Sequence, residues 1–374
     1  MGNLFRLNPL FEFELGSYPE KFNPNPTILQ KAKSMEYLFF ILSKPNDFVL
    51  LSEKVDPNFE DYSKTKFKSN GEFVSSDGIL KLDFNLIEWG RFHSLSQSGE
   101  LLDDLEKINC SMLLNSKISQ TQIYKDRDRL HSQVLDAQTA LQNPQYPLLF
   151  KPDLSFSGIQ QKVLSNREEL IAFQKKNTSK GVLQEYKNRV LDFSFLYEID
   201  ETSIQYLCTT EMQINEKNTY LSSKISKKSS LESILQMNSL EFTVLNEKII
   251  ELVWGFLSNI RTKYKGPLSV DGFVYKENNS LYIREISEIN FRYTMGRILY
   301  EISKKYPENK EHSLVTISSK DYKNMSDVSL HVLENRLKIQ FEVQNQTKVK
   351  TCILLTPPFL GGKLVSSCVV YYGT

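Results

Sequence analysis

The residues best suited to chemistry lie in one predicted β-hairpin, Ser269 to Arg292. Two apolar-rich strands flank the stretch Glu277 to Ser280, whose Asn-Asn centre is typical of a tight turn. With the turn centred on residues 278–279, Asp271 lies opposite Ile286 across the hairpin, and both share one face. This register predicts which other side chains join them.

Three oxygen-bearing side chains are expected on that face. Successive side chains of a strand point to opposite sides, so Asp271, Glu288 and Asn290 share one surface. Arg292 lies one step further along, and Glu285 points to the other side. The prediction requires an even loop and no bulge, because a one-residue slip would reverse the faces.

Two carboxylates and an amide oxygen on one surface suit a hard divalent cation. Mg²⁺ takes oxygen ligands in octahedral geometry and usually shares its coordination sphere with waters and substrate phosphates. The cation would also offset repulsion between the two carboxylates. The alternative is a solvated polar face, which antiparallel sheets commonly carry, and the hairpin alone does not separate these interpretations.

A second segment, Pro147 to Gly158, has the residue types of a phosphate site. A predicted strand ends in Lys151-Pro152 and runs into a loop of small residues, Ser155 to Gly158. A lysine at a strand end can reach a phosphate as a point charge, and a serine and glycine loop presents hydroxyl and backbone N–H groups to phosphate oxygens. Taken alone, an ordinary hairpin would explain the same residues.

The order of these segments resembles the ATP-grasp superfamily. Lys-Pro and its small-residue loop come first, followed by Leu183 to Tyr186, then Asp192, then Val270-Asp271 and Glu288-Ile-Asn-Phe-Arg292. The last run closely resembles the family's Glu-x-Asn-Pro-Arg, with phenylalanine in place of proline. The resemblance covers residues 117 to 302. It implies an α/β (α+β) ATP-grasp fold, in which two α+β subdomains clamp ATP, with an N-terminal α/β domain before it.

The resemblance also implies which residues bind the phosphates of ATP. Lys151 would contact the α- and β-phosphates. Ser155, Ser157 and Gly158 would belong to the mobile loop that closes over the triphosphate, although this loop has one glycine where many relatives have several. Lys117 matches a second phosphate-binding lysine, and its alternative is an ordinary surface lysine.

The nucleoside contacts follow from the same resemblance. Gln184, Glu185 and Tyr186 would form the hinge strand, whose backbone reads the adenine edge. Asp192 sits where the family commonly has an acidic residue for the ribose hydroxyls, and its alternative is an acidic residue in a turn.

The metal residues implied by the resemblance are Asp271, Glu288 and Asn290, which would hold one or two Mg²⁺, or Mn²⁺, between the β- and γ-phosphates. Arg292 would stabilise charge on the transferred phosphoryl group. Many related ligases carry an arginine two residues before the first aspartate. That position is Ser269 here, so Arg284 or Arg292 would take the role.

Members of this family transfer the γ-phosphate to a carboxylate, and an amine then displaces phosphate. The leading interpretation is therefore an ADP-forming carboxylate–amine ligase, a biosynthetic enzyme whose partners are small-molecule carboxylate and amine substrates. One alternative is an ATP-grasp phosphotransferase, a kinase with a stable phosphorylated product. Another is a non-catalytic nucleotide-binding protein, which would have no need of Lys151, Arg292 and all the metal residues together.

Five predicted units position these residues. They are an N-terminal α/β domain at 1–116, a linking helix at 117–145, a small lid subdomain at 146–191, a central subdomain with the metal site at 192–302, and a C-terminal α+β extension at 303–374. Lys117 to Gln142 has no glycine or proline and predicts a continuous helix. Strands are predicted at 48–51 and 78–84, and a helix at 326–337 is expected to precede a strand at 338–343.

The composition argues against several classes of protein. With 46 basic and 45 acidic residues, the chain lacks the basic excess of a general nucleic-acid or anionic-membrane binder. Its best apolar run, Tyr37 to Leu42, is far shorter than the roughly 20 residues of a membrane span. Four scattered cysteines with no C-x-x-C fit reduced thiols in a cytoplasmic protein. The oligomeric state stays open, a homo-oligomer included.

Overall fold

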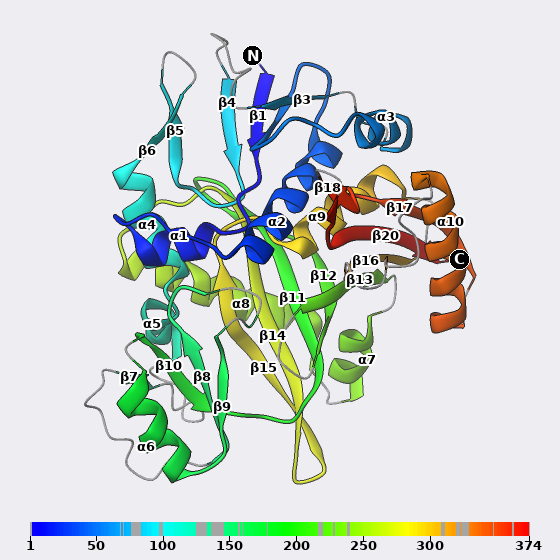
Figure 1. Cartoon of the computed structure of the whole chain (residues 1–374). Helices are drawn as coiled ribbons and strands as arrows, with labels where there is room; N and C mark the ends of the chain where they lie inside the picture. The colour runs from blue at the N-terminus through cyan, green and yellow to red at the C-terminus, as the bar shows by residue number, and fades with distance from the viewer. Residues whose placement is uncertain are drawn as a thin grey trace.

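The computed structural model in Figure 1 is a mixed α/β protein with three main sheets, of four, four and eight strands. The structure describes residues 2–67, 69, 71–75, 84–96, 100–124, 133–135, 146–155, 158, 160–177, 179–215, 220–226, 229–237, 240–307, 311–318, 322, 329–346, 348–360 and 363–373.

The N-terminal unit is a parallel sheet in the order β3-β2-β1-β4, with helices packed on it (Figure 1). Its strands are β1 (Gly2–Arg6), β2 (Phe48–Leu51), β3 (Glu72–Ser75) and β4 (Phe84–Glu88). Its other elements are α1 (Phe11–Ser17), α2 (Pro26–Met35), the 3₁₀ helix η1 (Glu36–Leu42), α3 (Pro57–Lys66), the hairpin β5 (His93–Leu95) and β6 (Leu101–Asp103), and α4 (Leu105–Asn115). The strand predicted at 48–51 is confirmed. The one predicted at 78–84 lies, except for Phe84, outside the described residues.

The helices α2 and α3 begin in the same way. The side chains of Asn25 and Asp56 accept hydrogen bonds from the N–H groups of Ile28 and Phe59, each at 3.0 Å. A proline follows each cap at the first helical position, where its missing N–H has no intrahelical partner to lose.

The predicted continuous helix from Lys117 to Gln142 is wrong. Helix α5 covers only Lys117–Gln120, and the 3₁₀ turn η3 continues over Thr121–Tyr124. Gln133–Leu135 forms strand β7, which pairs antiparallel with β10 at the edge of the small sheet. Pairing with a sheet edge therefore outweighs the local helix propensity of this segment.

A small antiparallel sheet, in the order β7-β10-β8-β9, carries one helix, α6, at the lower left of Figure 1. Its remaining elements are β8 (Leu148–Pro152), β9 (Lys162–Leu164), α6 (Arg167–Lys176) and β10 (Gly181–Glu185). The Asn166 side chain accepts a hydrogen bond from Glu169 N–H at 2.9 Å and so caps the N-terminus of α6.

An eight-stranded antiparallel sheet forms the centre of the molecule, in the order β15-β14-β11-β12-β13-β16-β20-β17. Its central strands are β11 (Arg189–Ile199), β12 (Ile204–Ile214), β13 (Tyr220–Ser226), β14 (Gly266–Glu277) and β15 (Ser280–Asn290). Helices α7 (Ser230–Met237) and α8 (Phe242–Asn259) cover one face, where Phe193 and Phe195 of β11 join their core. The alternate residues of β11 face the other side, which is left for a cavity.

The first and last parts of the chain share one hydrophobic core. Helix α9 (Met295–Lys305) buries Ile298 and Ile302 in a cluster that also holds Phe11 and Phe39 of the N-terminal unit. Strands β16 (Glu311–Ile317), β17 (Val349–Leu354) and β20 (Ser367–Gly373) extend the central sheet, and β18 (Phe359–Leu360) pairs with β19 (Lys363–Leu364). This shared core holds the N-terminal unit against the open face of the central sheet.

Helix α10 (Leu330–Asn345) replaces the predicted strand at 338–343, which is wrong. Leu333, Leu337 and Phe341 are spaced by four residues and all are buried, so they form one helical face. Phe341 stacks on Tyr371 of β20 with 4.5 Å between the ring centroids. In the part of the chain that the structure describes, no helix is both long and apolar enough to cross a membrane.

Candidate active site

The hairpin of β14 and β15 turns where the sequence predicts, at residues 278–279, whose φ angles of 48° and 63° are left-handed. The predicted register holds near the turn, where Phe273 pairs with Arg284. Beyond Phe273 the register shifts by two residues, so Asp271 pairs with Glu288 and not with the residue two positions earlier. The extra residues of β15 are accommodated by an irregularity of the β-bulge kind.

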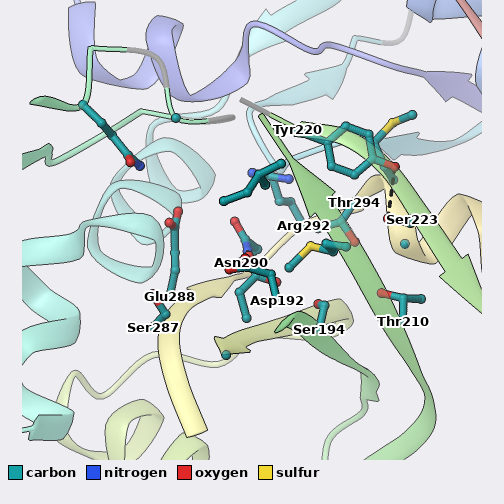
Figure 2. Close-up of a pocket in the computed structure, with 18 of the residues that line it drawn as sticks. Asp192, Ser194, Thr210, Tyr220, Ser223, Ser287, Glu288, Asn290, Arg292 and Thr294 are labelled. Atoms are coloured by element: carbon teal, nitrogen blue, oxygen red, sulfur yellow. Dashed lines mark hydrogen bonds between the residues drawn. The ribbon is translucent and has the colours of Figure 1, made fainter. Parts of the chain in front are cut away.

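The shift keeps the predicted oxygen ligands together but moves Ile286. Asp271, Glu288 and Asn290 line one cavity on the open face of the central sheet (Figure 2). Ile286, predicted to lie among them, is 3% exposed and packs in the core that includes α8, so that prediction is wrong. Glu285 lies on the opposite face as predicted, where its carboxylate accepts a hydrogen bond from a lysine of α8 at 2.6 Å.

The two carboxylates predicted to bind metal differ in their counter-charges. Burial disfavours the charged form of Glu288, but the charges of Lys117, 3.1 Å away, and Lys151 outweigh it and lower the pKa of Glu288. Asp271 accepts a hydrogen bond from Asn290 Nδ2 at 2.9 Å. Burial and the charge of Glu288 nevertheless raise the pKa of Asp271 to about 6. Asp271 is therefore the carboxylate whose counter-charge is incomplete.

This set of residues fits a divalent cation. Asp271 and Glu288 supply carboxylate oxygens, and Asn290 uses its Nδ2 on Asp271, which leaves its Oδ1 as an acceptor. A bound cation would supply the charge that Asp271 lacks. Oxygen donors of this kind are the ones that Mg²⁺ prefers.

Of the two predicted phosphate-binding lysines, Lys151 lines the cavity and Lys117 lies against its wall, 3.1 Å from Glu288. Both are almost fully buried, Lys117 at 6% and Lys151 at 5% exposure. Lys151 Nζ donates to Ser287 Oγ at 3.1 Å, and burial together with the charge of Arg189 lowers the pKa of Lys151 to about 7. Lys117 Nζ donates to the carbonyl of Ser155 at 2.7 Å. The surface-lysine alternative for Lys117 is wrong.

Two buried amides hold the backbone on either side of Asn290. Gln120 Oε1 accepts a hydrogen bond from Ile289 N–H at 2.9 Å, and its Nε2 donates to the Ile289 carbonyl at 2.7 Å. Asn115 Oδ1 accepts from Phe291 N–H at 3.0 Å. Phe291 stands where the family has proline, and it uses a backbone N–H that proline lacks. The departure from the family motif therefore has a structural use.

The two predicted catalytic arginines occupy different places. Arg292 lines the cavity, where it forms an ion pair with Glu12 of α1 and lies 5.8 Å from the Trp89 ring centroid. Arg284 is 4% exposed and lies 5.8 Å from the ring centroid of Phe273. Arg292 lines the cavity, and Arg284 is not among the described residues that line it.

Comparisons with known proteins place the fold. No family model matches the chain, and no curated protein matches its sequence. N5-carboxyaminoimidazole synthetase from Staphylococcus aureus, complexed with ADP, matches with a TM-score of 0.50 and 13% identity over 91% of this chain and 90% of that one. A further structure of that synthetase gives a TM-score of 0.50 and 12% identity over 99% and 93%. The chain has the ATP-grasp fold.

Of the segment predicted to be the phosphate loop, the structure describes Ser155 and Gly158. Ser155 is 2% exposed, and its Oγ donates to the Pro152 carbonyl at 3.2 Å. Gly158 reaches the cavity with a φ of 72°, a left-handed conformation that favours glycine. Ser157 lies outside the described residues.

The predicted ATP-grasp hinge leaves the small sheet for the central one. Gln184 and Glu185 end β10, and Tyr186 follows. The N–H of Tyr186 donates to the Pro147 carbonyl at 2.9 Å, so this residue would offer adenine its carbonyl and not its N–H. Glu185 pairs with Lys187 at 2.7 Å.

Asp192 lies in strand β11 and lines the cavity, so the turn alternative is wrong. Its Oδ1 lies 2.9 Å from Nη1 of Arg189, and burial raises the pKa of Asp192 against the opposing charge of that arginine. Arg189 also lines the cavity, with its guanidinium 4.4 Å from the ring centroid of Phe273. Together they form a charged pair that lines the same cavity as Lys151, a predicted phosphate-binding residue.

Sequence reasoning missed five residues of the site: Glu12, Trp89, Gln120, Arg189 and Ser287. Arg189 had a local signal, because it is three residues from Asp192. Ser287 precedes Glu288, and simple alternation assigned it to the other face. The remaining three meet the candidate site only through tertiary packing, and nothing in the local sequence marks them.

Proposed function

We propose that this chain is an ATP-dependent ligase, which activates a carboxylate as an acylphosphate for attack by an amine and releases ADP and phosphate. The observation that carries the proposal is the convergence of phosphate-binding and metal-binding residue types at one cavity. These residues are Lys117, Lys151, Asp271, Glu288, Asn290 and Arg292. The S. aureus synthetase was solved as a complex with ADP, which supports nucleotide binding by this chain.

The reaction has two displacements. An oxygen of the substrate carboxylate attacks the γ-phosphorus, the bond from that phosphorus to the β–γ bridging oxygen breaks, and ADP leaves. An amine nitrogen then attacks the carbonyl carbon of the acylphosphate, the carbon–oxygen bond to phosphate breaks, and the nitrogen loses a proton. Such transfers are catalysed mainly by positioning and charge stabilisation, so no nucleophilic side chain is required.

Each residue then has a specific task. Lys117 and Lys151 hold the phosphates, and Arg292 faces the transferred phosphoryl group at the far end of the cavity. The loop of Gly158 would keep water from the acylphosphate. Bound Mg²⁺, or Mn²⁺, would neutralise charge between the β- and γ-phosphates. Its ligands would be Asp271, Glu288 and Asn290.

The nucleoside would lie toward the hinge. The backbone of residues 184–186 would meet the adenine edge, and Asp192 would accept hydrogen bonds from the ribose hydroxyls. The ion pair between Arg189 and Asp192 fixes the position of that carboxylate.

Hydroxylamine tests the proposal without knowledge of the natural amine, because it traps acylphosphates as hydroxamates. ADP release is measured with MgATP and a panel of carboxylates, in the presence of hydroxylamine. Carboxylate-dependent release of ADP with an equal amount of hydroxamate is expected, and EDTA should abolish both. A stable phosphorylated product without hydroxamate would favour the phosphotransferase alternative. Absence of any MgATP binding would refute both activities.

A further inference from the structure

Beyond the phosphate residues the cavity wall becomes apolar. This part is lined by Met35, Trp89, Met212, Ile214, Tyr220 and Met295. They come from the N-terminal unit, from β12 and β13, and from the start of α9. Figure 2 shows Tyr220 and Thr294 across the cavity from Glu288 and Ser287, with Arg292 between the two sides.

Of the hydroxyl groups at this end, those of Ser223 and Thr294 are engaged within the protein, whereas the buried Thr210 Oγ1 has no hydrogen-bond partner among the described residues. Ser223 Oγ accepts a hydrogen bond from Tyr220 OH at 3.0 Å, and Thr294 Oγ1 accepts one from the N–H of Arg297 at 3.3 Å. Arg292 is the cation of this end among the described lining residues, and it is already paired with Glu12. Because Arg292 is also assigned to the transferred phosphoryl group, a second anionic group of a substrate would have no further cation at this end among the described lining residues.

We propose that the carboxylate substrate has a single carboxylate group and an apolar body, which packs against these six residues. The inference rests on the proposed ligase function and specifies its substrate class. The carboxylate would reach the γ-phosphate between Asp271 and Arg292, and the body would extend toward Met212 and Tyr220. A second charge buried there would lack a partner, which is strongly unfavourable. Each buried methylene should instead favour binding about fourfold.

Three of the six residues are methionines: Met35, Met212 and Met295. Methionine is unbranched and adapts to irregular shapes, so such a wall accepts apolar groups of different form. The enzyme should therefore discriminate strongly by polarity and weakly by branching.

The wild-type enzyme is tested with matched acids in the hydroxamate assay. Butanoate, pentanoate and hexanoate form a series in length, 4-methylpentanoate adds a branch, and adipate has the length of hexanoate with a second carboxylate. The kcat/KM should rise about fourfold per methylene from butanoate to hexanoate. Adipate should be at least about tenfold poorer than hexanoate, since its second charge is unpaired.

Met35→Lys supplies the missing cation. Met35 ends α2, where a positive charge is compatible with the helix dipole, so the variant should fold. Hexanoate should become at least about tenfold poorer and adipate at least about tenfold better, by the same pairing argument. Leu29→Lys, on the same helix at a position 38% exposed, is the matched control and should change neither. MgATP-dependent thermal stabilisation verifies the site in both variants.

The outcomes separate the two proposals. If wild-type enzyme uses adipate as well as hexanoate, the substrate class is refuted, while the hydroxamate still supports the ligase. If MgATP binds and no acid yields hydroxamate, the ligase proposal fails and this inference fails with it. If Met35→Lys keeps the wild-type preference between hexanoate and adipate, the substrate body does not lie against α2 and the inference is wrong.

Discussion

Glu288→Gln removes one negative charge from the floor of the cavity and keeps the shape of the side chain. Glu288 is the counter-charge of Lys117, 3.1 Å away, and its own side chain is 20% exposed. Breaking a fully buried ion pair costs about 3–5 kcal/mol, because one charge is left unpaired. Lys117 keeps the carbonyls of Asp153 and Ser155 as acceptors, at 3.3 and 2.7 Å. The ligand-free variant should therefore lose about 2 kcal/mol of stability.

The same substitution should change metal-bound and metal-free ATP binding in opposite directions. Mg²⁺ loses one of its two carboxylate ligands, so the metal-dependent part of ATP binding weakens. ATP alone gains, because a like charge about 5 Å from a phosphate opposes it by roughly 3 kcal/mol at an effective dielectric constant of about 20, before screening. After screening, metal-free ATP should bind at least about tenfold tighter. Turnover should fall about 10²- to 10³-fold.

Thermal shift with ATP plus Mg²⁺ and with ATP plus EDTA measures both effects. Glu285→Gln is the matched control, three residues before Glu288 on the same strand. Its carboxylate pairs on the other face with Lys248, which is 43% exposed, so the change should cost at most about 1 kcal/mol. If both variants lost the Mg²⁺ dependence of the ATP-induced thermal shift equally, the assignment of Glu285 and Glu288 to opposite faces would be refuted. Unchanged Mg²⁺ dependence in Glu288→Gln would refute the metal site.

Three further predictions follow from the same geometry. Burial lowers the pKa of Lys151 to about 7, and a bound triphosphate would favour its charged form again. ATP binding at pH 7.5 should therefore take up roughly half to one proton. Calorimetry in buffers of different ionisation enthalpy measures this uptake, which Lys151→Met should lose. Gln120→Met leaves the buried N–H and carbonyl of Ile289 without the hydrogen bonds that Gln120 makes to them. The free energy of unfolding in urea should fall by about 2–4 kcal/mol, and Mg²⁺ affinity should weaken as well. A variant with wild-type Mg²⁺ affinity would show that Gln120 does not position the metal residues. Gly158→Val puts a β-branched residue at a φ of 72° and should lower kcat more than stability, as steady-state ATP turnover and melting temperature would report.

The parts of the site that the sequence predicts correctly are local in the chain. The hairpin turn at 278–279 is encoded by two adjacent asparagines that tolerate left-handed φ angles. Alternation from that turn predicts the faces of Asp271 and Glu285, and a two-residue shift preserves their parity. The N-cap of α6 can likewise be recognised from the local sequence, because Glu169 follows Asn166 by three residues, the spacing of a capping box.

The predictions that fail do so because long-range tertiary contacts, and not the local sequence, determine those parts of the structure. The irregularity in β15 is absent from any local pattern, so Ile286 was assigned to the cavity, although it packs in the core. Residues 133–135 become a strand because β10 offers an edge to pair with, which the sequence of a helix-compatible segment does not reveal. The amide of Gln120 contacts the backbone of Ile289 in β15, and that of Asn115 contacts the backbone of Phe291, which follows β15. Their sequence separations are 169 and 176.

The two ends of the cavity differ in how far sequence alone can describe them. The phosphate end is built from charged residues between Lys117 and Arg292, and charge at a strand end is unusual enough to mark a site. The apolar end takes Met35 and Trp89 from the N-terminal unit and Met295 from α9. In sequence such residues are indistinguishable from core residues, because hydrophobic side chains are the normal content of helices and strands. Only the fold shows that they face the same cavity as the candidate phosphate-binding residues. The nucleotide chemistry can therefore be proposed from the motif, whereas the proposed substrate class depends on the structure.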